Sequence, residues 1–394
     1  MTAAIPAATT GLRAPGGADA AAASPAREAS LSCAIEVARV ALVIGLVFLH
    51  YFSFPNLDAP PFAGIDPRHP VATFVNGFVA FFFFSAVPLL SAISGWLFFA
   101  FEGRDPRAAM ARRVRKRAGS LLAPLVAWNL LTVLLVVALW RAAPTSGLLG
   151  QFGFDPATAG LSDTLDAVFG FTRLPIAFQF WFVRDLFLSV LACPLLWVLL
   201  RRAPFAGAVL LGVAWLAEFN FWGVFVRTDV LFFFYLGALV RTRGLDPRIG
   251  WSTTLWLLGV YTALMALRAL APLAVDAGEP GNQAILDLAT RLARPLGVAA
   301  CWGVCLRLAA LPFGEALARW GGAAFFLHAG HFPLIALVKF ALWKAVPAPT
   351  DGWMLAHYLA SVSLTVLLCA GAAVALFRLS PALYGFLAGG RRLG

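Results

Sequence analysis

The chain has 394 residues and is strongly apolar: 61% of its residues are hydrophobic and only 12% are charged. A soluble domain carries about 25% charged residues, so this composition excludes an ordinary soluble globular protein and predicts a polytopic membrane protein. The formal net charge of +11 comes from basic residues that separate apolar runs and are not interleaved with exposed aromatic residues, which argues against a nucleic-acid partner.

The first 32 residues differ from the rest, since Ala, Pro, Gly and Ser dominate them. They contain no apolar core of the kind that marks a signal peptide, and such a composition is typical of a segment that cannot form a packed core. We therefore expect residues 1–32 to be a disordered cytoplasmic tail and residues 33–394 to form one membrane-embedded domain.

Apolar runs separated by Pro, Gly and charged residues predict where this domain crosses the membrane. A spanning helix needs about 20 residues, and the runs predict an all-α bundle of about ten such helices. We expect them at residues 34–54, 74–101, 119–140, 180–200, 204–222, 226–240, 250–271, 292–311, 320–343 and 354–377.

The basic residues predict the orientation of the bundle, because cytoplasmic loops carry an excess of Lys and Arg. The densest basic cluster lies between the second and third expected helices and consists of Arg104, Arg107, Arg112, Arg113, Arg115, Lys116 and Arg117. Acidic residues, among them Asp66, Asp276 and Glu279, fall in the opposite loops. We therefore expect a multi-pass protein of the inner (plasma) membrane with both termini in the cytoplasm, and anionic membrane lipids as partners of the basic cluster.

Two ionisable residues, Arg39 and His50, lie inside the first expected span. An Arg at the centre of a spanning helix costs roughly 2.5 to 3.5 kcal/mol on insertion scales, so such residues are functional candidates. Eleven residues bring the chain to about 20° past three full turns, which places both side chains on one helix face about 16 Å apart. A structural explanation stays open, in which Arg39 reaches lipid headgroups and His50 makes an interhelical hydrogen bond.

The remaining chemistry-bearing residues show no metal or nucleotide signature. The five cysteines follow neither a zinc spacing nor a disulfide framework, and His328 and His331 lack an evident carboxylate or thiol to complete a metal site. No Walker loop, dinucleotide fingerprint or nucleophile elbow occurs where it could act. We therefore expect no bound metal.

The pattern of Arg39, ten residues and His50 resembles the signature of the acyltransferase 3 family, integral membrane enzymes that move acyl groups onto surface glycans and other acceptors. Five later segments are similar to family motifs and follow in the family's order. They are Val87–Phe98, Lys116-Arg117 before Leu121–Pro124, Phe180–Leu186, Phe232–Gly237 and Ala324–Pro333. The resemblance extends over residues 34–378.

This resemblance implies an O-acyltransferase that uses acyl-CoA, in the first instance acetyl-CoA, as donor substrate and holds no permanent cofactor. The acceptor it implies is a hydroxyl of a cell-surface or exported carbohydrate. It implies that His50 acts as general base or acyl carrier, assisted by Arg39, and that Arg39, Arg113 and Arg117 bind the donor.

Four further residues are implied in substrate binding, namely Trp181, Arg184, Asp185 and His331. The chain also departs from the family pattern at two positions. Ser120 stands where members often carry a second Arg, which leaves both Arg113 and Arg117 open as the donor ligand. His328 stands where Tyr is common, so no role carries over to it.

The chemistry of the residues agrees with acyl transfer, since a sugar hydroxyl needs a general base near neutral pH and His has the closest unperturbed pKa. Direct transfer and a route through an acyl-histidine intermediate both stay open. The alternative function is a transporter or flippase for a glycan or lipid-linked sugar. Such proteins are often built from repeats, and the Arg and His pattern has no second copy here. A non-catalytic scaffold of a polysaccharide-export complex would have no use for a buried Arg and His on one face.

Overall fold

The computed structural model describes residues 25–57, 60–101, 103, 105–145, 147–220, 224–347 and 349–393, which form helices and the turns that connect them. The α-helices are α1 (Pro25–Leu49), α2 (Pro70–Phe82), α3 (Ala86–Phe98), α4 (Pro106–Arg117), α5 (Ala123–Ala142), α6 (Leu161–Phe169), α7 (Phe180–Leu191), α8 (Cys193–Arg202), α9 (Pro204–Leu216), α10 (Thr228–Thr242), α11 (Trp251–Leu270), α12 (Pro280–Ala309), α13 (Pro312–Ala318), α14 (Ala324–Ala345), α15 (Asp351–Leu379) and α16 (Pro381–Leu387). Many of them begin with a Pro in the first turn, where its missing N–H removes no intrahelical bond.

The expected all-α membrane bundle is confirmed, and its spanning helices are fewer than the ten expected. Seven described helical segments are long and apolar enough to cross a membrane, or eight if α7 and α8, which meet at a 60° bend, form one span. These eight correspond to eight of the expected spans. The other two, expected at 204–222 and 226–240, are α9 and α10, with 13 and 15 residues. Both fall short of the roughly 20 residues that a span requires.

The start of α1 lies before the expected domain boundary. The helix begins at Pro25, so residues 25–32, which we expected in the tail, form its first turns. Glu28 in this first turn favours a helix start, because a carboxylate offsets the positive end of the helix dipole. Residues 1–24 lie outside the described part of the chain.

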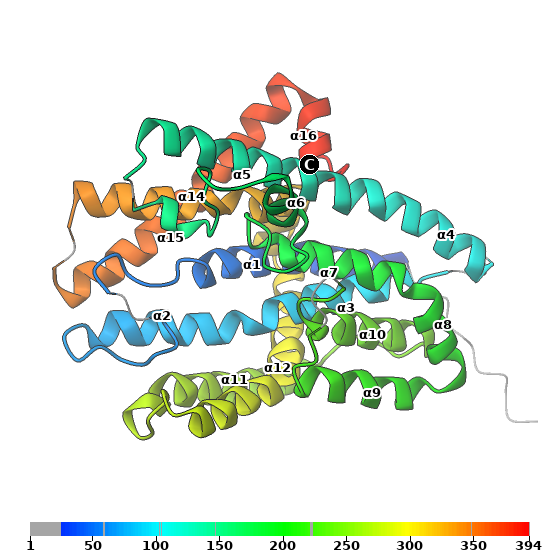
Figure 1. The fold of residues 1–394 in the computed structure, drawn as a ribbon. Helices are drawn as coiled ribbons and strands as arrows, with labels where there is room; N and C mark the ends of the chain where they lie inside the picture. Colours follow the sequence, from blue (N-terminus) through cyan, green and yellow to red (C-terminus); the bar gives the residue numbers. More distant parts are fainter. Residues whose placement is uncertain are drawn as a thin grey trace, which may run out of the picture.

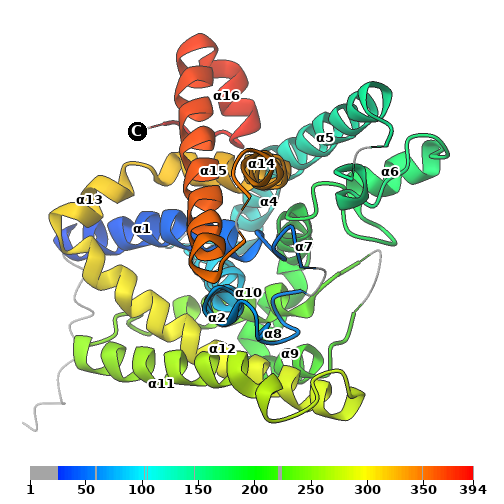
Figure 2. The same cartoon turned by 90° about the vertical axis from the view of Figure 1, so that its left-hand side faces the viewer.

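Helix α1 runs through the middle of the bundle, where it contacts α2, α3 and the group formed by α12 to α15 (Figure 1 and Figure 2). The pair α11 and α12 lies along one edge, and α15 and α16 lie along the opposite one (Figure 2). Because α1 has neighbours on all sides, both Arg39 and His50 face protein rather than lipid over most of their surface, with His50 only 8% exposed.

Helices α3 and α10 approach each other more closely than side chains would allow. A Cβ added at Gly95 would lie 1.9 Å from the Phe234 oxygen, and one added at Gly237 would lie 1.8 Å from the Ala92 oxygen. Small residues at such a contact let two membrane helices pack backbone against backbone. This contact explains why both resembling motifs, Val87–Phe98 and Phe232–Gly237, contain a Gly.

Candidate active site

His50 lies in the turn that follows α1, and the backbone of this turn is strained and held by hydrogen bonds. Phe52 has φ 57°, in the left-handed region that bulky residues avoid at a cost of order 1–3 kcal/mol. Asn76 Nδ2 of α2 donates to the Phe52 carbonyl at 2.8 Å. Lys339 Nζ of α14 donates to the two carbonyls on either side, at 3.1 and 3.0 Å. These bonds fix the turn between α2 and α14.

His50 pairs with His331 of α14. Their rings stack with centroids 5.0 Å apart and planes 6° from parallel, and His50 Nδ1 lies 2.7 Å from His331 Nε2. His331 Nδ1 lies 3.1 Å from the Leu327 carbonyl, which can only accept, so this nitrogen carries a proton. With neutral rings, His331 Nε2 is then the acceptor and His50 Nδ1 the donor. His50 Nε2 is left with a free lone pair, which no described residue engages.

A break in α14 positions the half of this helix that carries His331. Phe332 has non-helical angles (φ −113°, ψ 130°) before Pro333, which has no N–H to donate back to the carbonyl of Ala329. Gln179 Nε2 donates instead, to both the Ala329 and Phe332 carbonyls at 2.9 Å. The buried amide of Gln179 therefore satisfies the carbonyls that the break leaves in the interior.

His50 lines a cavity of about 270 Å³, which we name the histidine cavity. Aromatic side chains form most of its wall, and Phe178 packs edge-on against the His50 ring at 4.7 Å. Its charged members are Arg227, which lies over the Trp181 ring at 4.9 Å, and Asp229, which pairs with Arg227 at 3.0 Å. The cavity thus combines one unprotonated imidazole nitrogen with an apolar, aromatic wall and one ion pair.

A second cavity of about 80 Å³, the arginine cavity, is lined by Arg39 of α1, Arg117 of α4 and Arg391, which follows α16. Arg39 pairs with Glu36, and both side chains are about a third exposed. Arg117 forms no hydrogen bond or ion pair with any residue that the structure describes. Burial and the charges of Arg117 and Arg39 lower the pKa of Arg391 to about 9, so it remains charged at neutral pH. Three cations with one carboxylate form a site for an anion.

The two cavities adjoin, since Phe182 and His328 line both of them. His328 is only 4% exposed, and neither of its ring nitrogens has a hydrogen-bond partner among the residues that the structure describes. An unpaired buried polar group costs about 1–3 kcal/mol, so such groups are rare unless a ligand satisfies them. A ligand that reached from the arginine cavity to His50 would pass this imidazole.

The other expected substrate-binding residues separate into two groups. Trp181 lines the histidine cavity, whereas Arg184 and Asp185 line neither cavity. These two form a buried ion pair at 2.9 Å, and Asp185 accepts the backbone N–H of Arg227 at 2.8 Å. Their role in the structure is to hold the segment that brings Arg227 to the cavity.

Arg113 also lies away from the arginine cavity. Its guanidinium donates to the carbonyls of Leu97, Phe98 and Ala100 at the end of α3 and stacks over Phe101 at 5.4 Å. The last carbonyls of a helix lack intrahelical donors, so this contact caps α3. Of the two arginines left open by the sequence, the structure brings Arg117 alone to the cavity.

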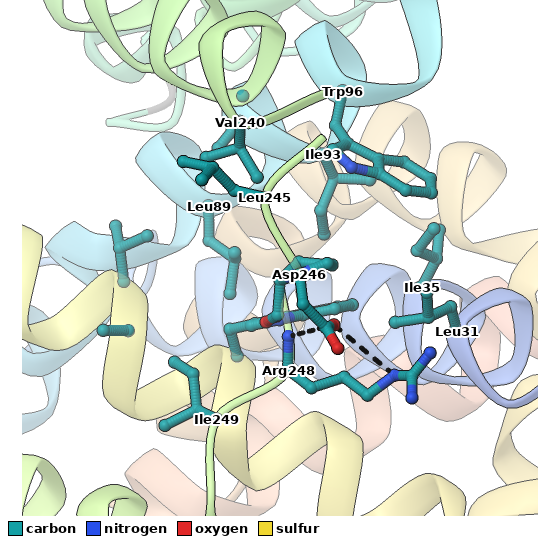
Figure 3. A pocket seen from close by; sticks show the side chains of 16 residues that line it. Leu31, Ile35, Leu89, Ile93, Trp96, Val240, Leu245, Asp246, Arg248 and Ile249 are labelled. Carbon is teal, nitrogen blue, oxygen red and sulfur yellow. Dashed lines mark hydrogen bonds and ion pairs between the residues drawn. The ribbon is translucent and has the colours of Figure 1, made fainter. Parts of the chain in front are cut away.

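A third cavity, of about 330 Å³, is almost entirely apolar (Figure 3). Leu31, Ile35, Ile93 and Trp96 form its wall, and the Asp246–Arg248 pair lies at one side. It shares Ile93 with the arginine cavity and no lining residue with the histidine cavity. Within the described ranges, no three His, Cys, Asp or Glu residues are grouped so as to hold a metal ion.

Comparison with known proteins defines the class of the molecule. The acyltransferase 3 family model, described as an acyltransferase domain, matches residues 34–375. This range includes α1 from Ala34 onwards, with Arg39, the following His50, and all but the last turn of α15. The chain therefore belongs to this family and is a multi-pass membrane acyltransferase. It is 28% identical over 319 residues to the succinoglycan biosynthesis protein ExoH of Rhizobium meliloti (strain 1021), covering 79% of this chain and 80% of the relative. No solved structure matches the chain significantly.

Four ionisable residues that line the two cavities were not assigned a role from the sequence. They are Arg227, Asp229, His328 and Arg391. Arg227 and Asp229 lie where charged residues crowd a short connection, and this crowding was the available signal for a site. Arg391 gave no signal, because two arginines near a chain end are equally typical of a cytoplasmic terminus.

Proposed function

We propose that the protein transfers an acyl group, most simply acetyl from acetyl-CoA, to a hydroxyl of a cell-surface or exported carbohydrate. The observation that carries this proposal is the pairing of His50 with His331, which leaves a free imidazole nitrogen in a cavity that adjoins three arginines. The carbohydrate acceptor is supported by the relative, whose name assigns it to the biosynthesis of a polysaccharide, succinoglycan.

The donor's phosphates bind in the arginine cavity, where Arg39 and Arg117 offer guanidinium groups that match phosphate geometry. The pantetheine arm then passes His328 and Phe182, the two side chains common to both cavities. The amides of the arm are hydrogen-bonding partners for the unpaired His328 ring. The thioester arrives in the histidine cavity beside His50.

His50 Nε2 is the general base in this scheme. It accepts the proton of the acceptor hydroxyl while the hydroxyl oxygen attacks the thioester carbonyl. When the tetrahedral intermediate collapses, the carbon–sulfur bond breaks and the thiolate takes the proton from the imidazolium. The products are the carbohydrate ester and the CoA thiol. His331 contributes through the hydrogen bond at His50 Nδ1, which orients the ring and stabilises its charged form.

The same atoms serve a two-step route. Nε2 would attack the thioester carbonyl, and the carbon–sulfur bond would break to release the CoA thiolate and leave an acyl-imidazolium. The hydroxyl oxygen would then attack the acyl carbon, the carbon–nitrogen bond would break to restore the imidazole, and the hydroxyl proton would neutralise the thiolate. Trapping distinguishes the routes: protein that is incubated with the donor alone, digested and analysed by mass spectrometry carries an acylated His50 peptide only in the two-step route.

The orientation follows from the basic residues. Arg39 and Arg117 face the cytoplasmic supply of acyl-CoA, and His50 lies towards the opposite side of the plasma membrane, with both termini in the cytoplasm. Transfer to an exported carbohydrate then needs no release of free acyl groups across the bilayer.

The test is acyl-CoA consumption by the purified protein in nanodiscs, followed through release of the free thiol in the presence of candidate glycans. We expect His50→Ala to lose at least ~10² to 10⁴-fold in rate while its expression and insertion are unchanged. A rate within twofold of the native protein would remove His50 from the chemistry. A protein that moves glycans without consuming acyl-CoA would be a transporter instead.

A further inference from the structure

The end of the chain folds back onto the arginine cavity. The C-terminal segment, which we define as residues 380–393, follows α15 and lies outside the family match, which ends at residue 375. Tyr384 Oη donates to the Gly322 carbonyl at 3.3 Å, and Trp128 Nε1 of α5 donates to the Leu387 carbonyl at 3.1 Å. Figure 1 shows α16 above α5, with the chain end near the junction of α4 and α5.

A two-glycine turn directs this segment towards α4. Gly389 and Gly390 have φ values of 66° and 79°, which other residues rarely adopt. A Cβ at Gly389 would lie 2.3 Å from the Ser120 oxygen, so the turn also needs a residue without a side chain where it meets the α4–α5 junction.

Beyond the turn, Arg391 occupies the wall of the arginine cavity beside Arg39 and Arg117. Its guanidinium lies over the Phe325 ring at 4.4 Å, and Nη1 donates to the Ala388 carbonyl at 2.9 Å. These contacts fix the side chain and leave further N–H groups without a described partner. Arg392, the next residue, is exposed and lines none of the three cavities.

The charges in the cavity point to the ligand. Arg391 forms no ion pair with a described carboxylate, Arg117 likewise has none, and Glu36 is engaged by Arg39. Guanidinium groups that face one another in a partly buried site repel, and an anion with several oxygens removes this cost. The donor brought to this cavity by the proposed function carries such an anion at its nucleotide end.

We propose that Arg391 binds a phosphate of the acyl donor, so that the C-terminal segment supplies, from outside the family domain, a third arginine of the donor site. The inference rests on the proposed function for the identity of the anion.

The experiment measures binding of coenzyme A and of pantetheine, which lacks the phosphates, to the full-length protein in nanodiscs. Three proteins are compared: the native chain, Arg391→Ala and the matched control Arg392→Ala. We expect Arg391→Ala to weaken coenzyme A binding about 10- to 100-fold, as for loss of a charged hydrogen bond, and to leave pantetheine binding unchanged. Arg392→Ala should bind both ligands like the native protein. Arg391→Lys, which keeps the charge without the planar fork, should recover part of the loss.

Equal coenzyme A affinities of Arg391→Ala and Arg392→Ala would overturn the inference. An equal loss of affinity for coenzyme A and for pantetheine in Arg391→Ala would also overturn it, because such a loss indicates a structural role of Arg391. Coenzyme A binding is measured without catalysis, so the experiment can contradict the role of Arg391 and the proposed acyl transfer independently. A native protein that binds coenzyme A without transferring an acyl group contradicts the proposed function alone. A native protein that binds no coenzyme A contradicts both.

Discussion

His331 orients His50 through a 2.7 Å hydrogen bond between Nε2 of the former and Nδ1 of the latter, and the two rings stack within 6° of parallel. The residues are 281 positions apart in the chain and come from the turn that follows α1 and from α14. The bond selects one tautomer of His50 and holds its ring plane. Loss of an orienting partner of this kind typically costs ~10 to 100-fold in metal affinity or activity at metal-bound histidines.

We therefore expect His331→Ala to lower kcat by about 10- to 100-fold, less than His50→Ala does. The double variant should be no slower than His50→Ala, because His331 acts through His50. Steady-state rates of thiol release measure both effects. Additive losses in the double variant would show that His331 acts independently.

Arg39 should affect donor binding more than the chemical step. Arg39→Ala is expected to raise the KM for acyl-CoA at nearly unchanged kcat, and Arg39→Lys to recover only part of the loss, since an ammonium cannot bind phosphate at two points. If Arg39 only reached lipid headgroups, Lys would replace it fully. KM values for the three proteins in nanodiscs decide between these outcomes.

Gln179 should be important for stability. Gln179→Leu removes the donor to the Ala329 and Phe332 carbonyls and leaves both unpaired, at a cost of about 1–3 kcal/mol for each buried group. Thermal unfolding in detergent, compared with the exposed control Gln283→Leu, measures the loss. An equal melting temperature for the two variants would mean that water satisfies both carbonyls.

Lys339 should stabilise the turn that carries His50. Lys339→Met keeps the length of the side chain and removes both bonds to the carbonyls beside Phe52, so we expect lower thermal stability and a lower kcat together. Lys344→Met, an exposed change in the same helix, is the control. A kcat equal to that of the control would separate the turn geometry from catalysis.

The proposed orientation predicts which loops a membrane-impermeant thiol reagent can reach in intact cells. A single cysteine at Arg107 should be protected, and one at Asp276 or Glu279 should be labelled. The experiment uses a background in which the five native cysteines are replaced by alanine or serine. The reverse labelling pattern would place His50 towards the cytoplasm and contradict the proposed export of the acyl group.

Much of the fold and part of the site could be predicted from local pattern. Apolar runs locate eight spans, and the first of them contains Arg39 and ends one residue before His50. The two side chains line adjoining cavities. The span number was harder to predict, because α9 and α10 are apolar enough to suggest spans but end after 13 and 15 residues. Pro and charged residues between apolar runs indicate where a helix ends, but they do not show whether that helix crosses the bilayer.

The rest of the site depends on contacts between distant segments, which have no local signature. Arg113 and Arg117 are equally basic in sequence, and only the position of the end of α3 makes Arg113 a cap. Arg184 and Asp185 look like site residues because they are charged within an apolar run, yet they pair with each other. Arg391 joins the cavity through a turn formed some 270 residues after Arg117.

Phe182 and His328 are the two residues that line both the arginine cavity and the histidine cavity. Side chains can change rotamer without any movement of the helices that carry them. Carriers that alternate between two openings must instead rock one bundle against another to expose a substrate on the far side. The proposed passage of an acyl arm from the arginine cavity to His50 would then require only rotamer changes of Phe182 and His328, with the helices at rest.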